Sequence, residues 1–156
     1  MGLYERYVLP KMIDLASSSR PTRKQREKVV PRAEGEVLEV GMGSGLNLPF
    51  YDRAKVRKVW GLEPSAGMRK LARRNRGGAD LGLEMIDLPG EEIPLGTDSI
   101  DTVLLTYTLC TIPNALLALR GMRRVLRPGG RLLFCEHGLA PDPDVASWQN
   151  RINPAS

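Results

Sequence analysis

The chain has 156 residues, of which 42% are hydrophobic, and this is enough apolar material for the core of one domain. It contains no run of about eighteen apolar residues, so the sequence predicts no transmembrane segment. Lysine and arginine total 23 against 18 acidic residues, and this mild excess, with few aromatic residues to stack on bases, argues against nucleic-acid binding.

Residues 1–35 are interpreted as an N-terminal helical cap. Apolar residues recur at helical spacing over residues 3–15, and a second helix is expected to start after Arg20, with Pro21 at an early position, and to run to Val30. We interpret the basic residues of the second helix as a solvated face. The alternative is a basic rim that attracts an anionic substrate or a membrane surface, which leaves peripheral membrane contact open. These basic residues are Arg23, Lys24, Arg26 and Lys28.

Strands alternate with helical segments from residue 36 to residue 140, and residues 141–156 are interpreted as the start of a truncated C-terminal segment. Helices are expected from near Leu46, from near Ser65 and over residues 115–126. This alternation predicts an α/β fold, a Rossmann-like doubly wound, mostly parallel sheet with helices on both faces. The expected strands are residues 36–40, 58–62, 83–86, 99–106 and 131–135.

The most informative feature is the glycine loop, residues 41–45, which reads Gly-Met-Gly-Ser-Gly and follows the first expected strand. Alternating glycines let a ligand lie directly on the backbone. Glu63, at the tip of the next strand, can then accept both ribose hydroxyls of that ligand. A nicotinamide or flavin fingerprint would place its third glycine at Leu46, so the spacing disfavours a nicotinamide-dependent oxidoreductase. The observed G-x-G-x-G pattern is the one used for S-adenosylmethionine.

Two cysteines, Cys110 and Cys135, lie in apolar strand contexts without metal-ligand spacing, so no metal site is predicted. We interpret both as buried, reduced thiols. The N-terminus begins with charged and aromatic residues instead of a signal-peptide pattern. Together these features predict a cytoplasmic protein.

The chain resembles the class I S-adenosylmethionine-dependent methyltransferases of the quinone-biosynthesis and small-molecule type. Flanking segments also resemble bacterial relatives of the thiol methyltransferases. The resemblance implies S-adenosylmethionine as the cofactor and methyl transfer to a small, apolar acceptor, whose nucleophilic atom (O, S, N or C) stays open. The segments that carry it, in order, are residues 37–45, 61–65, 90–94, 98–103 and 126–130.

The same family continues with two further strands, so the resemblance implies that this chain lacks the last two strands of the sheet. Residues 131–135 would then form an exposed edge, through which a homodimer could assemble. The alternative to an enzyme is a cofactor-binding module that is catalytically incomplete without a partner or a missing C-terminus.

The motifs and the resemblance together imply a set of cofactor-binding residues. Glu39 is expected to hold the cofactor ammonium directly or through water. Asn47 either binds the cofactor carboxylate or stabilises the turn, and Met68 either covers adenine or belongs to the core. The full set is Glu39, Gly41, Gly43, Gly45, Asn47, Glu63, Pro64, Met68, Gly90, Glu91 and Thr106.

Two residues are candidates for catalysis. Tyr107 follows the fourth strand with Thr106, and both are expected to face the methyl group. The tyrosine could favour the sulfonium through its ring or donate its hydroxyl to the substrate, or it could simply be a packing residue. His137 ends the fifth strand, where it could take a proton from the nucleophile or serve only as a structural hydrogen-bonding residue.

Overall fold

The computed structural model describes residues 19–75, 81–136, 138, 142 and 147 of the chain. The helix expected over residues 3–15 therefore lies outside the described residues. Single 3-10 turns η1 (Val30–Arg32), η2 (Leu48–Phe50) and η3 (Leu109–Thr111) lie in connections. The longer elements, in order, are α3 (Arg20–Val29), β1 (Gly35–Val40), β2 (Val56–Leu62), α4 (Ala66–Asn75), β3 (Glu84–Ile86), β4 (Ile100–Thr106), α5 (Ala115–Val125) and β5 (Leu126–Cys135).

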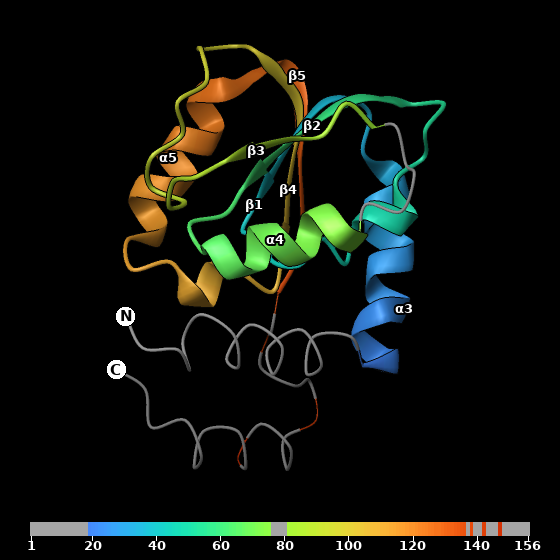
Figure 1. Ribbon diagram of the computed structural model, residues 1–156. Coiled ribbons are helices and arrows are strands. Elements are labelled where there is room, and N and C mark those ends of the chain that lie inside the picture. The colour runs from blue at the N-terminus through green and yellow to red at the C-terminus, as the bar shows by residue number, and fades with distance from the viewer. Residues whose placement is uncertain (1–18, 76–80, 137, 139–141, 143–146, 148–156) are drawn as a thin grey trace.

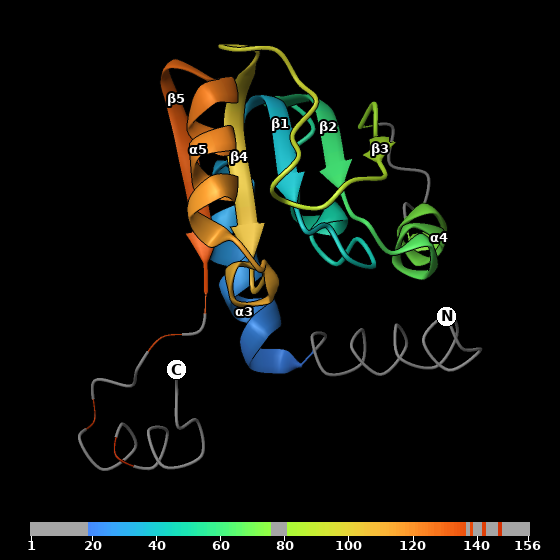
Figure 2. The same ribbon diagram turned by 90° about the vertical axis from the view of Figure 1, so that its left-hand side faces the viewer.

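The described residues form one five-stranded sheet in the order β3-β2-β1-β4-β5, and all neighbouring strands are parallel. Helix α5 packs on one face, while α4 and the end of α3 pack on the other (Figures 1 and 2). This confirms the predicted α/β doubly wound fold. The strand order reverses between β1 and β4, and ligands of such folds bind at the carboxyl ends of the strands at that point.

Alternation along the two central strands decides which side chains meet each layer of helices. In β1, Val37 enters the core beneath α4, whereas Leu38 enters the core beneath α5. In β4, Leu104 shares the first core, and its neighbours along the strand share the second. Because side chains alternate with a period of two, Glu39 and Thr106 fall on the α4 face, at the carboxyl ends of these strands.

The helix expected from near Leu46 does not form. Residues 48–50 make a single 3-10 turn instead, and the chain enters β2 at Val56. Pro49 lacks a backbone N–H and disfavours helical dihedrals in the residue before it. The carbonyl of Asp52 then accepts two backbone N–H groups, and this tight turn leads directly into β2. A crossover helix therefore has no room to extend.

The last strand also differs from the prediction, because β5 begins at Leu126 and not at Arg131. Ile100 of β4 pairs with Leu126, and Thr102 pairs with Arg131. Residues 127–130 of β5 therefore stand opposite the single residue Asp101 of β4, which makes a bulge between two paired segments. The strand therefore starts five residues earlier than expected and contains a bulge.

The two cysteines have different surroundings, and neither is in a disulfide in the described part of the chain. Cys135 is half-buried in β5. Cys110 is exposed, so the expectation that it would be buried was wrong. The reason is that β4 ends at Thr106, and Cys110 lies in the following turn η3 and not in a strand.

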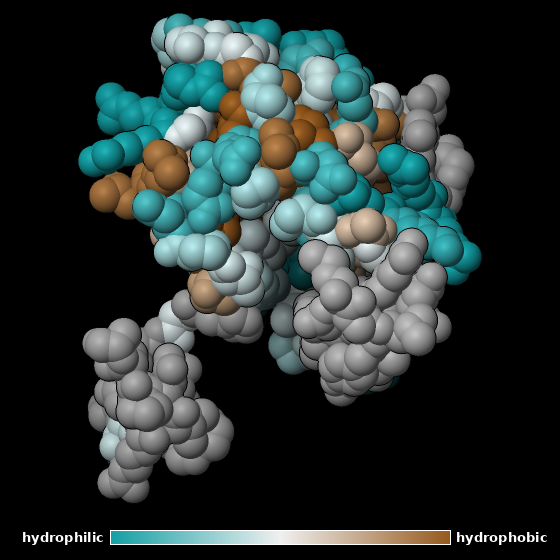
Figure 3. All heavy atoms as spheres, turned by 60° about the vertical axis from the view of Figure 1, so that its left-hand side comes forward, coloured by the Kyte–Doolittle hydropathy of each residue, from teal (hydrophilic) through white to brown (hydrophobic). Residues whose placement is uncertain are grey.

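The surface around α5 mixes hydrophobic and hydrophilic side chains, as Figure 3 shows. Among large hydrophobic residues of the described chain, Leu116 and Leu117 of α5 and Leu132 and Phe134 of β5 are the exposed ones. Phe134 has the largest exposed fraction, 64%. None of the described helices is long and apolar enough to cross a membrane.

Candidate functional site

A crevice of about 160 Å³ lies at the carboxyl ends of β1 and β2, next to the loop that follows β4. This is the edge at which the strand order reverses. The volume is below the range of about 300–1,000 Å³ that is typical of pockets enclosing a whole small ligand, so the crevice can enclose one end of such a ligand. Of the predicted site residues, it brings together Gly41, Glu63, Pro64, Gly90 and Glu91.

Glu63 is held in the crevice by two backbone groups. Its Oε2 accepts a hydrogen bond from the N–H of Gly43 at 3.0 Å, and its Oε1 accepts one from the N–H of Ser65 at 2.9 Å. The residue is 8% exposed, and burial raises the pKa of its carboxyl, although these backbone hydrogen bonds act in the opposite sense. Each carboxylate oxygen has a second lone pair, so the group can still accept two hydroxyl donors.

The glycine loop leaves its backbone open toward a ligand. Gly43 has φ +60°, and a Cβ at this position would meet nothing within 4 Å in the described part of the chain. Gly41 has φ +67°, and a Cβ there would come within 2.1 Å of Thr108. Glycine at 41 is therefore needed for packing, whereas glycine at 43 keeps a space free that a bound ligand can occupy.

Three of the predicted residues meet beneath the loop and not in the crevice. The Nδ2 of Asn47 donates to Glu39 Oε1 at 2.8 Å and to Thr106 Oγ1 at 3.0 Å. The hydroxyl of Tyr51 donates to Glu39 Oε2 at 2.7 Å. Glu39 is 1% exposed, and burial raises the pKa of its carboxyl to about 7. Both oxygens of Glu39 thus already have donors from the protein.

Arg26 completes this buried network, and its interpretation as part of a solvated helix face was wrong. The residue is 6% exposed. Its Nη1 donates to Asn47 Oδ1 at 2.8 Å and to Thr106 Oγ1 at 2.6 Å. Burial lowers the pKa of the guanidinium. The sequence did contain a signal, because Arg26 is three and four residues before Val29 and Val30, and this spacing puts them on one helix face.

Tyr107 lies beside the network in a backbone conformation that is uncommon for a residue other than glycine. Its φ is +57°, and such conformations concentrate at functional sites. The guanidinium carbon of Arg26 is 5.3 Å from the centre of the tyrosine ring. The Sγ of Cys135 donates to the Tyr107 hydroxyl at 3.3 Å. Burial, with this contact, raises the pKa of Tyr107 to about 12, so its hydroxyl stays protonated at neutral pH.

The remaining predicted residues are placed less centrally. Met68 is buried on α4, outside the lining of the crevice. Glu91 lines the crevice, and its Oε1 accepts a hydrogen bond from the N–H of Asn114 at 3.0 Å, which ties the loop to the start of α5. His137 lies outside the described residues.

Sequence reasoning missed two residues that hold the site together. Tyr51 was not considered, although it lies in the short connection to β2 and closes over Glu39. The carboxylate of Glu136 accepts the N–H groups of Thr108 and Leu109 at 2.9 and 3.1 Å. It thereby holds the loop after β4 against the end of β5. Its place directly after β5 was the signal that could have identified it.

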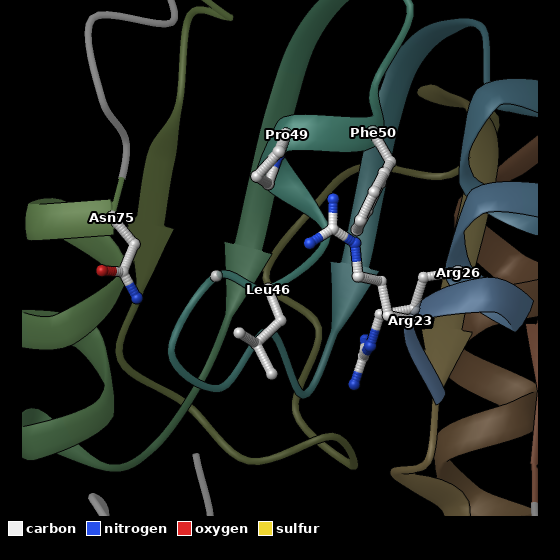
Figure 4. Close-up of a pocket in the computed structure, with 7 residues that line it drawn as sticks. Arg23, Arg26, Leu46, Pro49, Phe50 and Asn75 are labelled. Atoms are coloured by element: carbon white, nitrogen blue, oxygen red, sulfur yellow. The ribbon is translucent and has the colours of Figure 1, made fainter. Parts of the chain in front are cut away.

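A second pocket, of about 400 Å³, lies on the α4 face of the sheet. Figure 4 shows Arg23 and Arg26 projecting from α3 toward the loop that carries Leu46, with Asn75 on the opposite side. Gly45, the last glycine of the loop, lines this pocket, whereas Gly41, the first, lines the crevice that holds Glu63. Pro49 and Phe50 complete its apolar wall.

Comparisons with known proteins agree on one family. A family model described as "Methyltransferase domain" matches residues 38–134. The chain is 34% identical over 149 residues to thiol S-methyltransferase TMT1B of Homo sapiens, a match that covers 88% of this chain and 60% of the relative. It is 32% identical to a phosphatidylethanolamine N-methyltransferase of Cereibacter sphaeroides, with 77% and 59% covered. It is 30% identical to a demethylmenaquinone methyltransferase of Clavibacter sepedonicus, with 75% and 47% covered.

Solved structures are similar over most of the chain. An S-adenosylmethionine-dependent methyltransferase of Thermotoga maritima is 27% identical, with a TM-score of 0.64, and the match covers 84% of this chain and 58% of that one. The YcgJ protein of Bacillus subtilis is 23% identical, with a TM-score of 0.67 and coverage of 83% and 55%, and shows the shared fold. The chain thus spans only part of the length of its relatives, 60% for the human protein.

Proposed function

This chain belongs to the class I S-adenosylmethionine-dependent methyltransferases, and from this membership we propose that it transfers the methyl group of that cofactor to a small, apolar acceptor. The names of its relatives specify different acceptors, namely a thiol, phosphatidylethanolamine and demethylmenaquinone. The proposal therefore leaves the nucleophilic atom of the acceptor open among oxygen, sulfur, nitrogen and carbon.

The observation that carries the proposal is the environment of Glu63. Its carboxylate is fixed by the N–H groups of Gly43 and Ser65 and lies in the crevice with two acceptor positions left. This is the arrangement that a pair of ribose hydroxyls needs. Gly43 leaves open space above the loop, and Gly90 presents backbone without a side chain on the opposite wall. The residues present thus fit the nucleoside end of the cofactor.

The roles of the residues beneath the loop follow from their position. We propose that Glu39 holds the cofactor ammonium directly or through a water molecule, because each of its oxygens accepts one hydrogen bond from the protein and keeps a second lone pair. The proposed contacts of Thr106 and Met68 with the cofactor rest on the sequence motifs, and substitutions at each position would test them.

When bound, the cofactor supplies a sulfonium methyl group that is already a strong electrophile. The protein then has to hold the acceptor in line with the bond that breaks, and such positioning contributes up to about 7–11 kcal/mol in the best intramolecular models. With a pKa of about 12, the hydroxyl of Tyr107 can donate a hydrogen bond to the acceptor but does not act as a base at neutral pH. We propose His137 as the group that removes a proton from the nucleophile.

A second candidate function is a cofactor-binding module that turns over only with a partner. The exposed side chains of Leu132 and Phe134 on the edge strand β5 favour it, because apolar edges are normally covered or paired. We propose that two copies of the chain associate through this edge.

We also propose that the exposed basic residues of α3, Arg23, Lys24 and Lys28, allow peripheral contact with an anionic membrane.

Titration by calorimetry with S-adenosylhomocysteine, and in parallel with NAD, tests the proposed cofactor. We expect saturable binding of the first ligand only. Incubation with S-adenosylmethionine and a panel of small thiols, amines and quinols, with release of S-adenosylhomocysteine as the readout, then tests methyl transfer. Binding of NAD alone would contradict the proposed function, whereas binding of S-adenosylhomocysteine without turnover of any acceptor would favour the module.

A further inference from the structure

We propose that Arg69 of α4 is a positioning residue that holds Glu63 in the orientation that the ribose of the cofactor requires. This role rests on the proposed function and adds to it a residue that lies outside all of the sequence motifs. Arg69 is not part of the crevice lining, and its side chain is only 14% exposed. It therefore acts on a ligand through the residues that it contacts.

The guanidinium of Arg69 joins two segments that follow neighbouring strands. The chain passes from the end of β2 into α4, which carries Arg69 (Figure 2). Its Nη1 donates to the backbone carbonyl of Glu63 at 2.7 Å and also to Oδ1 of Asp87. Its Nη2 donates to Oδ2 of Asp87 at 2.6 Å. Because Glu63 directly follows β2 and Asp87 directly follows β3, one planar fork of donors fixes the ends of both strands.

The contact with Glu63 completes the hold on this residue. The N–H of Glu63 donates to a carbonyl of β3 at 3.0 Å, and the N–H groups of Gly43 and Ser65 bind its two carboxylate oxygens. Its carbonyl follows Leu62, the last paired residue of β2, and receives its donor from Arg69. An arginine that only tied α4 to the end of β3 would not need this second acceptor.

The charge of Arg69 supports the same role. Burial raises the pKa of the Glu63 carboxyl, whereas the two backbone hydrogen bonds and the charge of Arg69 act in the opposite sense. Arg69 therefore favours the ionised form of Glu63, in which both oxygens accept hydroxyl donors. Asp87, whose side chain is 67% exposed, balances the charge of the guanidinium on its solvent side.

The ribose makes this orientation important. It presents two neighbouring hydroxyls, and both can reach one carboxylate only when that group is correctly turned. Without Arg69 the end of β2 loses its link to Asp87, and the carboxylate of Glu63 gains rotational freedom. The loss should therefore appear in the recognition of the hydroxyl pair and not only in the stability of the fold.

Two ligands separate this role from a structural one. S-adenosylhomocysteine has both ribose hydroxyls, whereas its 2′-deoxy analogue has one. We would measure the Kd of both ligands by calorimetry for the full chain and for Arg69→Gln and Arg69→Lys. Arg73→Gln is the matched control, because Arg73 lies one turn further along α4 and is exposed. Asp87→Asn loosens the same link from its other end, and it provides the comparison if Arg69→Gln does not fold.

We expect the wild type to prefer S-adenosylhomocysteine by roughly 10- to 100-fold, because the analogue lacks one hydrogen bond to a charged group. In Arg69→Gln this preference should fall below about threefold, since the carboxylate is no longer held for the second hydroxyl. Arg69→Lys should lie between the two, because lysine keeps the charge but not the fork of donors. Asp87→Asn should also reduce the preference, and Arg73→Gln should retain it.

An Arg69→Gln protein that keeps the wild-type preference would overturn the inference, even if it binds both ligands more weakly. Equal affinity of the wild type for both ligands would refute the ribose role of Glu63 and this inference with it. A wild-type chain that binds neither ligand would refute the proposed function itself.

Discussion

The backbone N–H of Gly43 donates to Oε2 of Glu63 at 3.0 Å, and this bond fastens the glycine loop after β1 to the end of β2. The N–H of Ser65 holds the other oxygen at 2.9 Å, so the carboxylate is oriented before a ligand arrives. A group that is already positioned loses less entropy on binding. We therefore propose that Glu63 serves both the local fold and the ligand.

Replacement of Glu63 should weaken the cofactor strongly. In Glu63→Ala the ribose loses a charge-assisted acceptor, and we expect a loss of about 1.5–3 kcal/mol in the binding of S-adenosylhomocysteine. Calorimetry provides the measurement. Glu92→Ala is the control, since Glu92 follows the crevice residue Glu91 but is not part of the lining. An unchanged dissociation constant in Glu63→Ala would rule out the ribose assignment.

Two substitutions of Gly43 should separate the effect of backbone strain on stability from the steric exclusion of the ligand. Gly43→Val places a branched side chain over the loop and requires valine to adopt the dihedrals of this glycine. At φ +60° it cannot do so without strain, and left-handed backbone costs an L-residue about 1–2 kcal/mol. Gly43→Asn should be better tolerated, because asparagine accepts this conformation.

Both Gly43 variants should bind S-adenosylhomocysteine more weakly than the wild type, because a side chain enters the open space over the loop. Thermal unfolding is expected to show a lower midpoint for Gly43→Val than for Gly43→Asn. Wild-type affinity in Gly43→Asn would show that the ligand does not approach this glycine.

The buried carboxyl of Glu39 should make stability depend on pH. Its pKa in the folded chain, about 7, is above the ordinary value of 4.5, so the folded state holds the proton more tightly. The stabilisation is therefore present below pH 4.5 and is lost as pH rises through about 7. Between these values the free energy of unfolding should fall on the order of 1 kcal/mol per pH unit.

Urea unfolding of the wild type and of Glu39→Gln at pH 5 and pH 8 tests this dependence. The variant keeps a neutral polar side chain at the position, so its stability relative to the wild type should be higher at pH 8 than at pH 5. Other groups titrate in both proteins and cancel in the difference. A difference that is the same at both pH values would contradict the raised pKa.

The edge strand should mediate self-association. Phe134 is 64% exposed on β5, and we expect Phe134→Lys to shift the chain toward a monomer in sedimentation at micromolar concentration. Leu116→Lys is the matched control, since Leu116 is 61% exposed but belongs to α5. A wild-type monomer with full turnover, or equal effects of both variants, would exclude an interface at β5.

The features that could be predicted from the sequence are those in which a local pattern decides the structure. The glycine loop, Glu63 and the parallel sheet follow from motifs and alternation over a few residues. For Arg26, the spacing to Val29 and Val30 indicates only a shared helix face, whereas its partners Asn47 and Thr106 lie far along the chain and could not be predicted. The three-part division at residues 35 and 140 stays a prediction.

The short connection over residues 41–55 has a consequence for the order of folding. Chain entropy favours the closure of short loops, so β1 and β2 should pair before Leu38 of β1 finds Val103 of β4. The glycine loop and Glu63 both belong to this early unit. We therefore expect S-adenosylhomocysteine to accelerate refolding. Stopped-flow refolding with and without this ligand would show whether it binds the partly folded chain as well as the folded protein.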